Sequence, residues 1–245
     1  MSTTVESSVR AQVAEAGYAF APAEQVGATI SADEHLPQFL ALWDDLEPDN
    51  YLQGDYVFRR RRYSQVAFVP AEADFKRRAQ VAYAQSEEIN SYAGGIERVF
   101  APVTQEAIDN PVFRGLISSS FDVFDVPAEY RSREWTVEVH MFRLLTRGAT
   151  ETHPTPEGVH RDGVPMGALH MIGRKDIEGG VSHVYSMERE LLAVSTLRDP
   201  LDSFYAWDNR VMHYATPLFA TGLGEGHRDV LVYGFHLAGT KYERA

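Results

Sequence analysis

The stretch His-Pro-Thr-Pro-Glu-Gly-Val-His-Arg-Asp-Gly, residues 153–163, lies inside a region of short β-like runs that begins at Trp135. Glycine, proline and aspartate separate these runs, and several short strands with frequent turn signals are typical of a β-sandwich or barrel rather than of βαβ units. In an extended segment residues i and i+2 project to the same side, so His160 and Asp162 are expected to point together. The runs that we predict as strands cover residues 136–145, 167–172, 181–185, 203–207, 211–216 and 229–237.

Upstream of this region the pattern is mixed and mainly helical. Apolar residues at helical spacing predict a helix ending at Gly17, a second over residues 33–46, and a third after Thr104 that Pro111 kinks or divides. We therefore expect a mainly β protein with flanking helices (α+β) in one domain of 245 residues, with a helix-rich part over residues 1–134 and a β core over residues 135–245.

The His160-Arg161-Asp162 tripeptide is a candidate metal site, and His213 is a candidate third ligand on another predicted strand. Two imidazoles and one carboxylate suit a borderline divalent metal, and this set with open positions is typical of non-haem Fe(II) oxygenases. In a chain with nine histidines, however, a His-x-Asp sequence also arises as ordinary surface polarity.

Arg228 opens an otherwise apolar predicted strand, 15 residues after His213. An arginine there needs an anionic partner, and its guanidinium grips carboxylates in a bidentate fork, so a dicarboxylate such as 2-oxoglutarate fits. A salt bridge to an acid at the strand edge is the alternative.

Composition excludes several classes of protein. The formal net charge is −12, which disfavours a nucleic-acid partner, and the absence of cysteine rules out disulfides and thiolate metal sites. No apolar stretch approaches the 18 residues of a membrane span, and the first twelve residues contain no secretory signal. We expect a cytoplasmic protein that does not bind a membrane; nothing in the sequence predicts its oligomeric state.

Several motifs together resemble the 2OG-Fe dioxygenase family, in particular the bacterial hydroxylases of free L-amino acids of the L-isoleucine 4-hydroxylase type. They are residues 154–163, Gly-Gly-Val-Ser at 179–182, His213 with Thr216-Pro217, and Arg228; residues 94–100 and 56–63 also look similar. The resemblance implies a double-stranded β-helix (jelly-roll, cupin-like) with helices on its outer face. It further implies Fe(II) on His160, Asp162 and His213, with Arg228 binding the distal carboxylate of 2-oxoglutarate. Val230 departs from the serine that many relatives have two residues after this arginine.

An amino-acid substrate needs an acceptor for its ammonium and a donor for its carboxylate. Glu157 and Arg143 are the candidates; a loop carboxylate satisfied by backbone amides is the alternative for Glu157. The run Arg59–Arg62 would alternate faces if extended, and a solvated basic edge is the preferred interpretation.

The expected function is Fe(II)- and 2-oxoglutarate-dependent hydroxylation of a small, free, aliphatic L-amino acid, with O2 as cosubstrate and succinate and CO2 as products. Three alternatives stay open. A cupin-type metal enzyme would have no use for 2-oxoglutarate, and a jelly-roll binding module would have no activity. A hydrolytic zinc enzyme would usually carry a His-Glu-x-x-His motif, which the sequence lacks.

Overall fold

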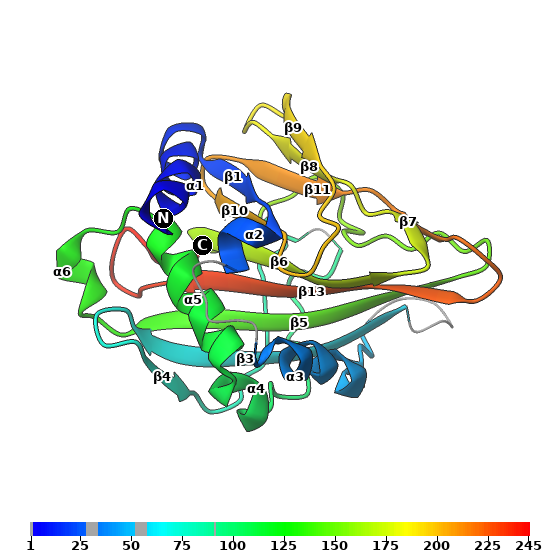
Figure 1. Cartoon of the computed structure of the whole chain (residues 1–245), viewed down its shortest axis with the longest axis horizontal. Coiled ribbons are helices and arrows are strands. Elements are labelled where there is room, and N and C mark those ends of the chain that lie inside the picture. Colours follow the sequence, from blue (N-terminus) through cyan, green and yellow to red (C-terminus); the bar gives the residue numbers. More distant parts are fainter. Residues whose placement is uncertain (1, 28–33, 52–57, 91) are drawn as a thin grey trace.

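A large antiparallel sheet forms the centre of the computed structural model, which describes residues 2–27, 34–51, 58–90 and 92–245. Its order is β1-β10-β6-β13-β5-β3-β2, and β4 pairs with the free part of β3 (Figure 1). The strands of this main sheet are β1 (Tyr18–Ala21), β2 (Glu47–Pro48), β3 (Arg59–Val69), β4 (Asp74–Arg77), β5 (Trp135–Arg147), β6 (Met166–Lys175), β10 (Ser203–Trp207) and β13 (Glu225–His236).

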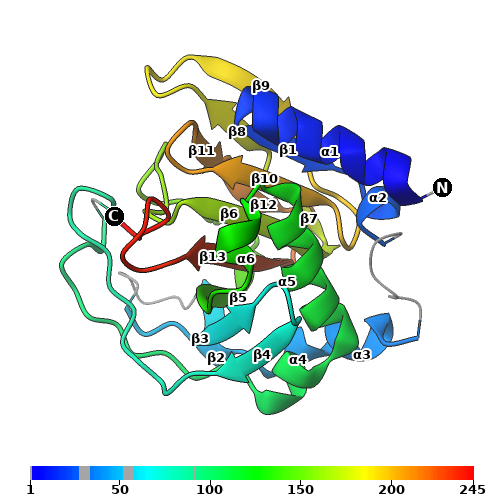
Figure 2. The ribbon, with the colours of Figure 1, turned by 90° about the vertical axis from the view of Figure 1, so that its left-hand side faces the viewer.

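A smaller set of strands faces the main sheet (Figure 2). It consists of a three-stranded sheet in the order β11-β8-β9 and the pair β12-β7. Two facing antiparallel sheets make the jelly-roll, so the predicted mainly β fold with flanking helices is confirmed. The strands of this smaller layer are β7 (Ile177–Gly179), β8 (Ser182–Tyr185), β9 (Leu191–Ser195), β11 (Met212–Ala215) and β12 (Leu218–Ala220).

The helices cover the outer face of the main sheet, where α5 crosses β13, β5 and β3 (Figure 1). The predicted division at Pro111 is confirmed, because Asn110 caps the following helix through its side chain and Pro111 occupies the first turn, where its missing N–H is not needed. The helices are α1 (Ser2–Ala16), α2 (Ala23–Gly27), α3 (Leu36–Ala41), the 3₁₀ helix η1 (Leu42–Asp45), α4 (Gln105–Asp109), α5 (Pro111–Val123) and α6 (Ala128–Arg131).

Side chains along each long strand alternate between this outer face and the inner face, which looks toward the smaller sheet. On β5, Val137, Val139 and Met141 belong to the apolar core beneath the helices, whereas the even-numbered residues between them line an internal cavity. The register pairs Arg61 with Phe142, and Phe142 with Val230, so inner-face residues form rows across β3, β5 and β13. This alternation decides which charged residues reach the cavity.

Two expectations about the first 134 residues need correction. β1 and β3 are integral strands of the main sheet, so a boundary at residue 134 does not separate helices from sheet. The run Arg59–Arg62 is not a solvated edge either, because β3 is paired on both sides and buries Arg61 and Arg62.

The helix predicted over residues 33–46 is present in part, as α3 followed by η1, and Asp33 lies outside the described residues. The predicted strands all occur with shifts of a few residues at their ends, whereas β1, β2, β3, β4, β7, β9 and β12 had no counterpart in the prediction. None of the helices in the described ranges is long and apolar enough to cross a membrane.

Candidate metal centre and active site

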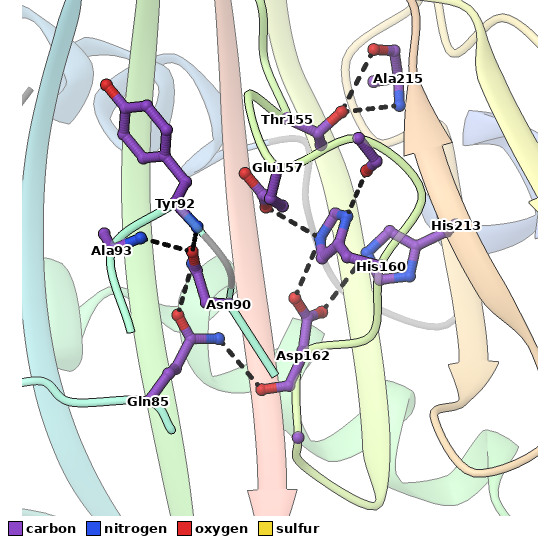
Figure 3. A network of polar contacts seen from close by, with 12 residues as sticks. Gln85, Asn90, Tyr92, Ala93, Thr155, Glu157, His160, Asp162, His213 and Ala215 are labelled. Carbon is purple, nitrogen blue, oxygen red and sulfur yellow. Dashed lines mark hydrogen bonds and ion pairs between the residues drawn. The ribbon is translucent and has the colours of Figure 1, made fainter. Parts of the chain in front are cut away.

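The segment carrying His160 and Asp162 is a loop held against β11 of the smaller sheet. The extended segment expected there pairs through only one bridge, in which the backbone N–H groups of His160 and His213 each donate to the other residue's carbonyl at 3.0 and 2.9 Å. The Thr155 hydroxyl lies 3.3 Å from both the carbonyl and the N–H of Ala215 and fastens the start of the loop (Figure 3). These contacts bring the two histidines together although 53 positions separate them in the sequence.

His160, Asp162 and His213 converge as the sequence predicted. One potential ligand atom from each lies within 4.8 Å of the others, and no other group of this kind occurs among the residues that the structure describes. The two Asp162 carboxylate oxygens lie 3.5 Å from Nε2 of His160 and 3.6 Å from Nε2 of His213 (Figure 3). Two imidazole nitrogens and a carboxylate at these separations have the donor types and spacing of a facial triad for Fe(II).

The protonation of His160 also fits a metal ligand. Its Nδ1 lies 2.9 Å from the carbonyl of Gly158, which only accepts, so Nδ1 carries the proton and the lone pair of the neutral ring is on Nε2. Burial disfavours the imidazolium, but Asp162 and Glu157 together raise the pKa of His160 to about 9. The negative potential that favours a proton here would equally favour a divalent cation.

Asp208, which sequence reasoning missed, fixes the backbone of the metal-site loop. Its carboxylate accepts the N–H groups of Asp162 and Gly163 at 2.7 and 3.0 Å. Gly163 has φ +78°, a conformation that side chains rarely tolerate, so the sharp exit of the loop depends on glycine. Burial and the nearby Asp162 carboxylate raise the pKa of Asp208 to about 7. The only sequence signal for this role of Asp208 was an aspartate in a turn after a predicted strand.

The metal-site residues open into a cavity of about 180 Å³ between the two sheets. Arg228, buried on the inner face of β13, lines it, and its Nε and Nη2 have no partner among the described residues. Burial and the cross-strand neighbour Arg174 lower the pKa of Arg228 to about 10. None of the described residues is therefore the acid at a strand edge that the sequence left open as its partner, and Arg228 is available to an anionic ligand.

Val230 lines the cavity two residues after Arg228 and offers no hydroxyl. Arg174 lies opposite Arg228, donates to the carbonyl of Gly179 at 2.8 Å, and keeps a buried Nη1 without a partner in the part of the chain that is described. A second cation therefore lies directly opposite Arg228 on the neighbouring strand, and like charges in this position destabilise a sheet. An anion bound between them would remove that cost.

The structure separates the two candidates for substrate binding. Glu157 lines the cavity, and its Oε1 lies 3.2 Å from Nε2 of His160. Arg143 is on the outer face of β5, where it pairs with Asp229 at 2.7 Å and with Asp44 at 3.1 Å. Arg143 does not line the cavity, so the expectation that it binds substrate is wrong, because the alternation along β5 directs it to the helix side.

A further layer of polar residues lies beside the metal-site loop. Gln85 donates to the backbone carbonyl of Asp162 at 3.2 Å, and its own oxygen accepts from Asn90 (Figure 3). The same oxygen also accepts from Arg98. The sequence flagged residues 94–100 only as a similar motif and gave Gln85 and Asn90 no role. Their segment has little regular structure, so no periodicity pointed to them.

Comparisons with known proteins support the interpretation of this cluster as an iron site. Residues 40–234 match the sequence profile of the 2OG-Fe dioxygenase family. Over 199 residues the chain is 25% identical to L-isoleucine-4-hydroxylase of Bacillus thuringiensis, covering 80% of this chain and 81% of that protein.

Solved structures share the whole fold. A bsmA homologue from Methylobium petroleophilum PM1 superposes with a TM-score of 0.84 at 26% identity, covering 96% of this chain and 94% of the other. IDO from Bacillus thuringiensis superposes with a TM-score of 0.76 at 20% identity, covering 94% and 98%, which is a likeness of fold. The family profile spans most of the chain and includes the His-Asp-His cluster, so this protein belongs to the 2OG-Fe dioxygenase family and is an enzyme that uses Fe(II), 2-oxoglutarate and O2.

Proposed function

We propose that this enzyme hydroxylates the side chain of a free aliphatic L-amino acid. The observation that carries the proposal is a single cavity that contains three converging metal-ligand atoms, a buried unpaired Arg228 and an apolar wall. The similarity to an L-isoleucine-4-hydroxylase supports an aliphatic substrate. The cytoplasmic location expected from the sequence stays a prediction.

In this proposal His160, Asp162 and His213 hold the iron. Their fit rests on the Nδ1–Gly158 hydrogen bond, which leaves Nε2 of His160 as the ligand atom, on the separation of the donor atoms and on the loop fixed by Asp208. Bound there, ferrous iron with 2-oxoglutarate and O2 supplies the oxidant that places one oxygen atom on a C–H bond while 2-oxoglutarate leaves as succinate and CO2.

Arg228 would bind the distal carboxylate of 2-oxoglutarate, with Arg174 as the second cation at that end. Two charge-assisted hydrogen bonds from the unpaired Nε and Nη2 would orient the cosubstrate. Deep burial strengthens these bonds because water does not compete for the guanidinium.

Glu157 would accept the ammonium group of the amino acid, since its carboxylate lies in the cavity next to the metal ligand His160. Phe142, Leu169, Phe204, Val230 and Val232 provide an apolar surface for an aliphatic side chain. Their part is to place one C–H bond and to exclude water and alternative positions.

The test is to incubate the purified enzyme with Fe(II), ascorbate and 2-oxoglutarate against each standard amino acid. We expect a gain of one oxygen atom in a small set of aliphatic amino acids, with succinate formed in equal amount. Succinate formation that no amino acid stimulates would contradict the proposal. Oxygen consumption that does not require 2-oxoglutarate would instead favour the cupin-type alternative.

A further inference from the structure

Three arginines form a second cationic cluster in the cavity, apart from Arg228. Arg59 and Arg61 come from the inner face of β3, and Arg98 comes from the segment that bridges to Tyr83. Arg61 and Arg98 are only 2% and 3% exposed. Because Arg59, Leu144 and Arg228 share one cross-strand row, the cluster begins two strands, or about 10 Å of backbone, from Arg228.

The described residues neutralise this cluster only in part. Asp49 forms its close ion pair with Arg59, whose Nε and Nη2 lie 2.8 and 2.7 Å from Asp49 Oδ2. The same oxygen is 3.7 Å from Nη1 of Arg61, too far for a hydrogen bond.

The other partners of the cluster are uncharged. Arg61 Nη2 donates to Nδ1 of His140 at 2.7 Å, and burial followed by the charge of Arg61 holds the pKa of His140 well below its ordinary value. Arg98 donates to the amide oxygen of Gln85 at 3.2 Å. The Nε atoms of both Arg61 and Arg98 are buried and have no hydrogen-bond partner in the described ranges.

Aromatic rings hold these guanidiniums in place. The guanidinium carbon of Arg61 lies 3.7 Å from the ring centre of Phe100 and 4.6 Å from that of Phe142, and Arg98 lies 4.9 Å from Tyr83. Cation–π contacts of this kind offset part of the cost of burial and fix the orientation of the planar groups, but they supply no negative charge. An arginine with its geometry fixed and its charge only partly balanced by the described residues is suited to a carboxylate.

The cluster is also connected to the metal-site loop. Gln85 accepts from Arg98 through its amide oxygen and donates to the backbone carbonyl of Asp162 through its amide nitrogen at 3.2 Å. Glu157, which touches His160, lines the same cavity and is close enough to act electrostatically on Arg98. A carboxylate at the arginines and an ammonium at Glu157 therefore match the two ends of one zwitterion.

We propose that Arg61 and Arg98 bind the α-carboxylate of the amino-acid substrate, so that the enzyme requires a free carboxylate and rejects amino acids linked through that group to an amide, an ester or a carrier. This inference rests on the proposed function. The role of Arg228 differs, since Arg228 holds the cosubstrate.

The first experiment compares free acids with their neutral derivatives. L-Isoleucine, L-leucine, L-valine and L-methionine are supplied as free acids, primary amides and methyl esters, and oxygen insertion is measured by mass spectrometry. We expect kcat/KM for amides and esters to fall by on the order of 10²-fold or more, because a site built for a carboxylate leaves its cations unpaired with a neutral analogue. Equal turnover of acids and amides would overturn the carboxylate site but leave the hydroxylase intact. Oxidation of none of these free acids or other standard amino acids would overturn both.

The second experiment uses Arg61→Met and Arg98→Gln, with Arg60→Met as the matched control. Arg60 neighbours Arg61 on β3 but is exposed on the outer face, where its Nη1 donates to the carbonyl of Leu46 at 3.3 Å. We expect the cavity variants to raise KM for the amino acid by roughly 10²-fold and to lose most of the preference for acid over amide, while Arg60→Met behaves as wild type.

Two readouts guard against a merely structural effect. KM for 2-oxoglutarate should stay within about twofold of wild type in Arg98→Gln, because Arg228 rather than Arg98 binds the cosubstrate in this proposal. A rise in KM for 2-oxoglutarate instead would assign the cluster to the cosubstrate and overturn the proposal. An unchanged preference for acid over amide in a folded Arg98→Gln or Arg61→Met enzyme would overturn it as well.

Discussion

Arginines on the two faces of the main sheet differ in their hydrogen-bond and ion-pair partners. On the outer face Arg143 binds Asp229 through two nitrogens at 2.8 and 2.7 Å, and Arg62 donates to Asp45 and to the carbonyl of Pro102. On the inner face of the same sheet, Arg61 and Arg228 each keep at least one buried nitrogen without a partner in the described part of the chain.

This contrast distinguishes arginines that stabilise the fold from arginines available to ligands. A buried cation without a counter-charge costs free energy, so the inner-face arginines do not improve the stability of the empty protein. Arg143 and Arg62 on the outer face already have carboxylate partners. Substitutions on the two faces should therefore change different measurements, activity on one and stability on the other.

The largest effect on activity is expected at the metal site, which lies on the inner side of the main sheet. Asp162→Ala removes the carboxylate shared by His160 and His213, and we expect weak binding of Fe(II) and a loss of turnover of roughly 10³-fold or more. Fe(II) titration and succinate formation measure this. Removing the metal from the wild type with a chelator should give the same loss, reversed by Fe(II), and wild-type turnover in Asp162→Ala would break the assignment.

Arg228→Met tests whether Arg228 binds 2-oxoglutarate. Loss of two charge-assisted hydrogen bonds should raise KM for 2-oxoglutarate by roughly 10²-fold, since each 1.4 kcal/mol is tenfold in affinity. Because Arg228 has unpaired nitrogens and a like-charged neighbour, the melting temperature should not fall. A folded variant with unchanged KM for 2-oxoglutarate would contradict the assignment of Arg228.

Arg143→Met is the matched change on the outer face. It leaves the carboxylate of Asp229, which is 5% exposed, without its main partner, so the free energy of unfolding should fall by about 2 kcal/mol while KM values stay unchanged. Denaturant titration provides the measurement. The double variant Arg143→Met/Asp229→Leu should recover most of the loss, because Asp229 no longer leaves a buried unpaired charge and the other partner, Asp44, is exposed to solvent. A specific rise in KM for the amino acid would instead show that Arg143 binds the substrate.

Sequence alone located the three residues of the candidate metal site because their chemistry is local. His160 and Asp162 are two residues apart beside a glycine-rich loop, and only one long-range partner, His213, had to be found. Arg228 was recognisable because a cation at the start of an apolar strand is unusual. The long strands were recognisable from their runs of β-branched and apolar residues.

Sequence failed where the answer depended on pairing across the sheet. Arg61 and Arg143 are both arginines in strands, and only the register of β3 with β5 shows that they point to opposite faces. Arg98 and Gln85 reach the cavity through an irregular segment whose turn is fixed by Asn90, which accepts the N–H groups of Tyr92 and Ala93. Such tertiary positioning leaves no periodic pattern in the sequence.

The smallest expected effect concerns two histidines, one on each face of the main sheet. His140 on the inner face bonds to Arg61, whereas His170 on the outer side is enclosed by the hydroxyls of Ser120 and Ser203 at 3.0 and 2.6 Å. Burial lowers the pKa of His170 to about 3, from 6.5 in the unfolded chain. Its neutral form therefore contributes stability that is complete above pH 6.5 and is lost as the pH falls toward 3, because only the unfolded chain takes up the proton.

His170→Gln should remove this single-proton contribution. Between pH 6 and 4 we expect the slope of unfolding free energy against pH to decrease by up to about 1.4 kcal/mol per pH unit. Urea titrations at several pH values measure the slope, and KM values at neutral pH should match wild type because His170 faces α5 rather than the cavity. An unchanged slope would mean that His170 is not neutral in the folded protein. A change in KM would mean that the two faces of the sheet are coupled through β6.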